Sequence, residues 1–533
     1  MTANNDALSY LMENGLSSDE ISRYLSEGIS MEELVTAVQG LTSRRESVDS
    51  DTQSVKPEDY SDAGNAEVFS REYSSHLAYV DSMGWLYWSG KKWERNEHKA
   101  LLMALEFSAR LRMEAMEEYT DALHAEAVAK ANNPDGGEEV KKAMEATKRA
   151  KAFLAHANMT RRAARIKAIL ELSKPNLYVP GSAMDANPVE LNTSDGIIDL
   201  RTGERKCHRQ SSYCTMITAE SPDADGAADI WQNFLDVITC GNEELKDFLQ
   251  MIIGMALFGK VYHEGIVFAV GDGRNGKSTF FNAVGAVLGD YTGYINIDVI
   301  TTKGSGDKAA LATLRGKRMV IAGELEEGRR LSAATVKKLA STDPFQVEEK
   351  YKQPETVKPS HTLFLFTNHL PRVGSTDLGT WRRIINVPFN AVIDPKQSVQ
   401  NFGDILAKNA SSAILAWALE GAQRFAENEF HLDIPQCVKT ATEEYRRREH
   451  WLQNFIDECC EVGPNFRVQA RVLYAEYKTW AENAGEHARC EKDFAEEMDK
   501  LGYTRIQPKN IKHYLGLKSR LVDVMGYGKV TAV

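Results

Sequence analysis

The sequence predicts an α/β protein in which a parallel sheet with a phosphate-binding loop lies between an α+β domain and a helical C-terminal domain. A short β-branched run at 266–270 leads into a glycine-rich turn and then into a helical pattern. Two further apolar runs, 317–322 and 361–366, each end in polar side chains. Helical patterns at 97–175 and beyond 441 flank this core.

Composition limits the classes of protein that the chain can belong to. Its 533 residues are 43% hydrophobic and 26% charged, with a net charge of −12, which predicts several globular domains. Residues 1–66 carry thirteen Asp and Glu against four Lys and Arg, so the rest of the chain is close to neutral. This disfavours a surface that is basic all over, but it leaves room for a basic channel. No apolar run reaches the roughly 18–20 residues needed to span a bilayer, there is no signal-peptide pattern, and the seven scattered cysteines suit a reducing compartment. We therefore expect a cytoplasmic protein with no membrane contact.

The first part of the chain divides into three predicted segments. Residues 1–45 have apolar positions at helical spacing and predict a small helical module, either an interaction domain or a loosely ordered extension. Residues 46–68 are rich in Ser, Asp and Glu, which predicts an acidic flexible linker. Residues 69–240 predict an α+β domain that precedes the sheet.

Two features of that α+β domain have alternative interpretations. The aromatic-rich stretch around 76–95 predicts a hairpin whose Trp residues belong to a core, with exposed base-stacking as the alternative. The helical pattern of 97–175 is broken once, at 132–137. Basic residues on these helices form either a solvated face or part of a nucleic-acid path; they are Lys148, Arg149, Lys151, Arg161, Arg162, Arg165 and Lys167.

The strand at 266–270 runs into Gly271-x-x-x-x-Gly276-Lys277-Ser278, followed by a helix. Glycines allow backbone N–H groups to close around phosphates, Lys277 supplies a point charge, Ser278 a Mg²⁺ ligand, and the helix N-terminus a partial positive charge. A Gly-rich turn without a ligand is the alternative. The residues expected to bind ATP are Gly271, Asp272, Gly273, Arg274, Asn275, Gly276, Lys277, Ser278 and Thr279.

Polar residues after the other strands complete the predicted chemistry. Glu324 is assigned to the metal and water system and Glu326 to its partner, the general base, with an ordinary acidic turn as the alternative. Asn368 follows the third strand, where an amide can bond a γ-phosphate or orient water. Arg382 and Arg383 precede a further strand and are candidates to reach the nucleotide of a neighbouring subunit, with surface ion pairing as the alternative.

In this order, the glycine loop, the Glu324–Gly328 acids, Thr367–Pro371 and Trp381–Arg383 resemble a superfamily-three helicase. The resemblance covers roughly 70–533 and is to the phage and plasmid branch that includes satellite-phage and poxvirus primase–helicases. It implies an AAA+-like P-loop ATPase core at 241–395, a helical connection at 396–440 and a winged-helix-like DNA-binding domain at 441–533, with a purely structural lid as the alternative for this last segment.

The resemblance also implies a mode of action. It implies a homo-hexameric ring that binds ATP and Mg²⁺ between subunits and moves 3′ to 5′ on single-stranded or forked DNA, in a bacterial host cell if phage-encoded. The DNA-gripping hairpin corresponds to 345–354, so Lys350 and Lys352 are expected to contact DNA, with pairing to Glu348 and Glu349 as the alternative.

The acidic N-terminal stretch shows no primase pattern. We therefore expect a helicase without priming activity, or one that recruits a primase or another replication protein through its N-terminal module. The rival functions are an ATP-switched initiator that melts an origin and a DNA-bound scaffold.

Overall fold

The computed structural model describes residues 54–301, 311–323, 329, 331–347, 355–371, 373, 378–396, 399–483 and 488–520. The chain divides into two compact units. Unit 1 comprises residues 1–74 and 98–177, and unit 2 comprises residues 75–97 and 178–533.

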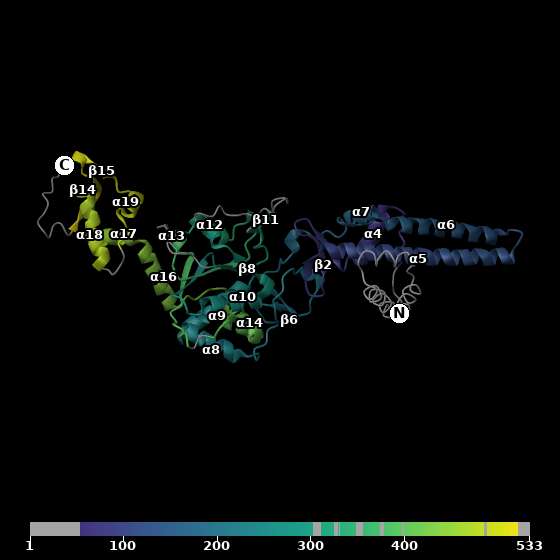
Figure 1. The fold of residues 1–533 in the computed structure, drawn as a ribbon, viewed down its shortest axis with the longest axis horizontal. Helices are drawn as coiled ribbons and strands as arrows, with labels where there is room; N and C mark the ends of the chain where they lie inside the picture. The colour runs from purple at the N-terminus through teal and green to yellow at the C-terminus, as the bar shows by residue number, and fades with distance from the viewer. Residues whose placement is uncertain are drawn as a thin grey trace, which may run out of the picture. The chain divides into compact units, whose positions relative to one another are not determined.

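The described part of unit 1 is helical. Long helices α5 (Glu97–Asn132) and α6 (Glu138–Thr160) run side by side (Figure 1) and are joined where the sequence predicted a break. The Thr147 hydroxyl of α6 donates to the Ala122 carbonyl of α5 at 3.1 Å. The predicted helical stretch is confirmed, with a second break between α6 and α7 (Ala163–Ser173).

Helix α4 (Asp62–Tyr73) begins inside the range that we assigned to the flexible linker, so that boundary was wrong. The Ser61 side chain caps the helix by accepting a hydrogen bond from the Gly64 backbone N–H. Its first turns bury small residues against α7, and the Ser173 hydroxyl donates to the Ala66 carbonyl at 3.2 Å. Small buried residues carry little hydropathy signal, which is why composition did not reveal this helix.

Unit 2 begins with a three-stranded antiparallel sheet of β1 (Leu77–Val80), β2 (Gly84–Trp88) and β3 (Trp93–Arg95). Trp85 and Trp93 are each only 3% exposed. The prediction that this aromatic hairpin forms a core is therefore confirmed. A second antiparallel sheet contains β4 (Glu190–Thr193), β5 (Gly196–Asp199) and β6 (Arg205–Lys206).

The centre of unit 2 is a parallel five-stranded sheet with the order β13-β7-β12-β9-β8. Alternate residues of β7, β9, β12 and β13 pack into separate apolar clusters, such as Val267 in one and Ile266 with Phe268 in the other. Both faces are thus covered, which explains the uninterrupted apolar runs in the sequence. The strands are β7 (Ile266–Val270), β8 (Thr292–Ile295), β9 (Met319–Ala322), β12 (Thr362–Thr367) and β13 (Ile384–Pro388).

One of these clusters joins the sheet to several helices (Figure 1), and Trp231 of α8 stacks on Phe280 of α10 within it. The helices are α8 (Ala228–Ile238), α9 (Glu243–Leu257), α10 (Lys277–Leu288), α14 (Phe402–Asn409) and α15 (Ser411–Glu427). The other cluster includes α12 (Ala333–Leu339) and Tyr445 of α16 (Gln436–Glu449), and short helix α13 (Leu378–Trp381) precedes β13.

The C-terminal region has its own core, centred on Phe455, Tyr477 and Phe494. Its elements follow the order helix, strand, helix, helix, strand, strand, and its sheet has the order β14-β16-β15. They are α17 (Trp451–Cys459), β14 (Cys460–Gln469), α18 (Ala470–Asn483), α19 (Glu491–Lys500), β15 (Arg505–Ile506) and β16 (His513–Ser519).

Candidate functional site

The glycine loop joins β7 to α10, as the sequence predicted. Two of its glycines have no room for a side chain. A Cβ on Gly271 would lie 2.1 Å from the Phe389 carbonyl oxygen, and a Cβ on Gly276 would lie 2.4 Å from Ile238 Cγ2. Gly276 also has a φ of +80°, a conformation that other residues rarely adopt. The loop therefore requires glycine at both positions.

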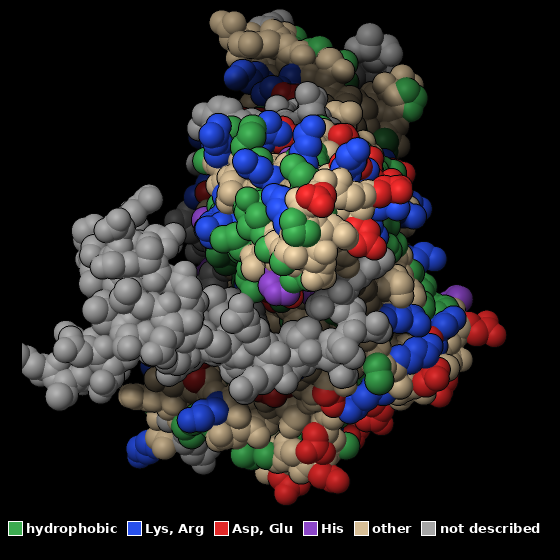
Figure 2. All heavy atoms as spheres, turned by 90° about the vertical axis from the view of Figure 1, so that its right-hand side faces the viewer, with side chains coloured by type: hydrophobic (Ala, Val, Ile, Leu, Met, Phe, Trp, Pro, Cys, Tyr) green, Lys and Arg blue, Asp and Glu red, His purple; other side chains and the backbone are tan. Residues whose placement is uncertain are grey.

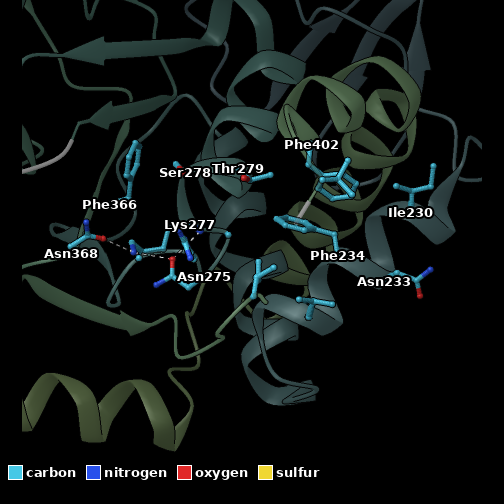
Figure 3. Close-up of a pocket in the computed structure, with 16 residues that line it drawn as sticks. Ile230, Asn233, Phe234, Asn275, Lys277, Ser278, Thr279, Phe366, Asn368 and Phe402 are labelled. Carbon is cyan, nitrogen blue, oxygen red and sulfur yellow. Dashed lines mark hydrogen bonds between the residues drawn. The ribbon is translucent and has the colours of Figure 1, made fainter. Parts of the chain in front are cut away.

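The Lys277 side chain lies at the centre of the loop and is only 4% exposed. Its Nζ donates to the Gly271 carbonyl at 2.7 Å. It also donates to Asn275 Oδ1 at 2.9 Å and to Asn368 Oδ1 at 3.1 Å (Figure 3). Asn275 Nδ2 in turn donates to the Phe389 carbonyl at 3.1 Å. These bonds connect the loop to the residues that follow β12 and β13, at the carboxyl edge of the sheet.

A cavity of about 670 Å³ opens beside this lysine. Its polar wall consists of residues 273–279 and Asn368, and Ser278 at this wall is exposed. Of the predicted loop residues, Gly271 and Asp272 do not line the cavity. The volume lies within the range of about 300–1,000 Å³ that is typical of small-ligand pockets.

The opposite wall is apolar and was not predicted from the sequence. Phe234 of α8 and Phe402 of α14 lie with ring centroids 5.6 Å apart, and both line the cavity (Figure 3). Ile230, Val237, Ile393 and Val399 extend this wall. The polar wall suits phosphates and the apolar wall suits a planar base. No local sequence motif predicts these residues, because they come from segments on both sides of the loop in the sequence.

Four predicted site residues lie outside the described part of the chain: Glu324, Glu326, Lys350 and Lys352. β9, which precedes the two glutamates, ends at Ala322 opposite Leu365 of β12. At the position of the predicted hairpin, two strands pair antiparallel. They are β10 (Phe345–Val347) and β11 (Glu355–Val357).

The two neighbouring arginines have different environments. Arg383 is buried, and it donates from Nη1 to the Gly379 carbonyl at 2.6 Å and from Nη2 to Glu264 Oε2 at 3.2 Å. The Thr342 hydroxyl and, to a lesser extent, Arg383 hold the pKa of the Glu264 carboxyl below its usual range, so this carboxyl is charged at neutral pH. Arg382 is exposed and, with Arg446, lines a second cavity of about 330 Å³.

None of the helices within the described ranges is long and apolar enough to cross a membrane. The described side chains also include no cluster of three or more His, Cys, Asp or Glu that would hold a metal ion.

The fold and the site together define a mixed α/β protein with a cavity at the carboxyl ends of its parallel strands, where ligands of such sheets bind. Residues 66–240 match the family described as D5 N terminal like. Residues 269–383 match a family of unknown function, DUF5906.

Several viral proteins are similar to this chain. The "Putative helicase L207/L206" of Acanthamoeba polyphaga mimivirus is 27% identical over 215 residues, which are 39% of this chain and 22% of the relative. The "Putative primase C962R" of African swine fever virus is 21% identical over 341 residues, 58% of this chain and 35% of the relative. The "Putative helicase V13" of Sputnik virophage is 28% identical over 140 residues, 25% of this chain and 18% of the relative. The matched segment spans about a fifth to a third of the length of these relatives.

Among solved structures, the apo structure of the NrS-1 C terminal region is similar over 56% of this chain and 77% of that one, with 10% identity and a TM-score of 0.34. The match of residues 66–240 to the D5 N terminal like family and the similarity to these viral proteins support the resemblance to phage and viral primase–helicases.

Proposed function

We propose that the protein is an ATP-dependent DNA helicase that acts in the replication of a phage or mobile element. The observation that carries this proposal is Lys277, which is fixed by the glycine loop and Asn368 at the wall of a cavity of nucleotide size. The resemblance to viral proteins named as helicases and primases supports replication as the context.

Each wall of the cavity has a role in this proposal. When ATP enters, Lys277 exchanges its contacts with loop oxygens for contacts with phosphate oxygens, and the N-terminus of α10 adds its partial positive charge. Asn368, at the end of the neighbouring strand, then bonds the γ-phosphate. The rings of Phe234 and Phe402 receive the base.

Mg²⁺, held by Ser278 and Glu324, would neutralise the charge that develops on the phosphates. Glu326 would accept the proton of the attacking water. Because Arg383 is bound to Glu264 within its own chain, we assign the contact with a neighbouring subunit's nucleotide to the exposed Arg382. This assignment requires a ring, and the family resemblance suggests a hexamer moving 3′ to 5′.

Lys350 and Lys352 would grip the DNA strand through its phosphates, which makes the contact independent of base sequence and sensitive to salt. The decisive measurement is ATP hydrolysis with and without single-stranded DNA, at two salt concentrations, for the wild type and for Lys350→Ala/Lys352→Ala. A motor predicts turnover that DNA stimulates and stimulation that the double variant loses. If DNA does not change the rate of ATP hydrolysis in either protein, the helicase proposal is refuted, and an origin-melting initiator or a scaffold is favoured.

Unwinding of a forked duplex by the same proteins separates the remaining cases. A helicase unwinds the fork in proportion to its DNA-stimulated turnover. An initiator that hydrolyses ATP on DNA without unwinding the fork would contradict the proposal.

A further inference from the structure

The second part of unit 1 is strongly basic in a chain that is acidic overall. Residues 141–167 contain nine Lys and Arg and a single acid, Glu145. They form the greater part of α6, the turn after it and the start of α7. Figure 2 faces the end of the α5–α6 pair and shows Lys and Arg side chains gathered on its upper part, with Asp and Glu mainly to one side.

Within this region four exposed cations lie on α6 and in the turn after it, and we name them together the basic stripe: Lys148, Lys151, Arg161 and Arg162. Lys148 and Lys151 are three residues apart on α6 and therefore neighbours on one side of the helix. Arg161 and Arg162 lie in the turn that follows α6, about 20 Å from Lys148 along the helix axis at the helical rise. Among the described residues, none of these four side chains forms an ion pair.

Two other cations of α6 are in a different situation. Lys142 pairs with Glu138 at 3.5 Å, and Arg149 pairs with Glu145 at 3.7 Å. At about 100° per residue, Lys142 and Arg149 lie roughly 100° or more around the helix from Lys148. Glu145 lies three residues before Lys148 and is therefore also its neighbour on the helix, but among the described ion pairs it is bound to Arg149 and to no cation of the basic stripe.

The shape of the basic stripe favours a rod-like partner. Between its cations lie Ala152 and Ala155, which are exposed and small, so a broad partner can approach the helix closely. The aromatic rings in 138–173 are Phe153 and His156, and both are buried. A surface that binds single strands uses exposed rings to stack bases, and this surface has none within that range.

We propose that the basic stripe binds the phosphate backbone of duplex DNA, independently of base sequence. The stripe offers four cations along about 20 Å of α6 and the turn after it, and a duplex presents one negative charge per 1.7 Å or so of its axis. This site is separate from the cavity at Lys277 and from the hairpin expected to grip a single strand. It would hold the duplex to the protein whether or not ATP is hydrolysed.

The test compares two double charge reversals in the full-length chain. Lys148→Glu/Lys151→Glu alters the stripe, and Lys142→Glu/Arg149→Glu is the matched control with the same change of charge on the same helix. Affinity for a labelled duplex of mixed sequence and for a single strand of equal length is measured by anisotropy over a range of salt concentrations. ATP hydrolysis without DNA is measured in parallel, and circular dichroism checks the helix content.

We expect the stripe variant to lose about tenfold or more in duplex affinity, and its plot of log K against log salt to become shallower by about two. The control variant should lose much less duplex affinity, and ATP hydrolysis without DNA should equal that of the wild type in both variants. Equal losses in both variants would overturn the proposal, since they would report net charge alone. Unchanged duplex binding by the stripe variant, or an equal loss for the single strand, would overturn it as well. If either variant folds poorly, Lys148→Gln/Lys151→Gln against Lys142→Gln/Arg149→Gln repeats the comparison.

Discussion

The two ends of the parallel sheet each hold a buried cation, and the two cations behave differently. Arg318, just before β9, and Lys277, just after the glycine loop, are both 4% exposed. Arg318 donates to the carbonyls of Leu257 and Glu190 and lies over the Tyr291 ring at 4.6 Å. Lys277 lines an open cavity. The two side chains are therefore equally buried but have different roles: Arg318 anchors the fold, and Lys277 is a candidate ligand contact. The cavity beside Lys277 is what distinguishes them.

The central strand β12 repeats this contrast along its own length. His361, immediately before it, is buried, and burial lowers the pKa of its imidazole to about 4. Asn368, immediately after it, is exposed and bonds Lys277. Polar side chains at the amino end thus hold the fold, while those at the carboxyl end remain available to a ligand.

The largest effect should come from Lys277→Ala, which removes the charge at the cavity wall. We expect ATP turnover to fall by about 10²- to 10³-fold, as when one preorganised donor to a reacting group is removed. Phosphate release measures the loss, and the melting temperature shows whether the fold is intact. If a folded Lys277→Ala variant still hydrolysed ATP at a substantial rate, Lys277 would have no role in the reaction.

At the opposite end, Arg318→Met should cost stability and leave chemistry alone. The substitution leaves two buried carbonyls without their donor, which we expect to lower the free energy of unfolding by about 2–4 kcal/mol. Urea unfolding measures this change. Turnover per folded molecule should match the wild type. A loss of turnover without a loss of stability would contradict the assignment of a purely structural role to Arg318.

His361 predicts a pH dependence of stability. Because its pKa falls from 6.5 to about 4 on folding, the unfolded chain binds an extra proton between these values, so stability declines as pH falls through this window. The contribution is about 2 kcal/mol between pH 7 and pH 5. His361→Phe should flatten the profile by that amount in urea unfolding at the two pH values. Parallel profiles of variant and wild type would contradict it.

The part of the site that follows from the sequence is the part encoded locally. A β-branched run, two glycines and a lysine predicted β7, the loop and the start of α10, and the polar residue after β12 predicted that Asn368 lies near Lys277. Parallel strands bring their carboxyl ends to one edge, which is why residues far apart in sequence were correctly placed together.

Tertiary packing determined the rest. From the sequence, Arg382 and Arg383 could not be told apart. In the structure Arg383 forms a buried ion pair with Glu264, which is far away in the chain, whereas Arg382 is exposed. The apolar wall likewise depends on how α8 and α14 pack beside the loop. Hydrophobic periodicity does not show which aromatic ring of a helix borders a cavity.

That apolar wall gives the smallest of these effects and the sharpest test of what the cavity holds. Phe402, half-buried on α14, faces Phe234 across the wall. If a base stacks there, Phe402→Ala should raise the KM for ATP by about tenfold, the lower part of the range for one base on one ring, with kcat nearly unchanged because the phosphates keep their contacts. Phe402→Tyr keeps the ring and should restore the KM. An unchanged KM in Phe402→Ala, or a loss confined to kcat, would mean that the base binds elsewhere and that the wall serves only to pack α14.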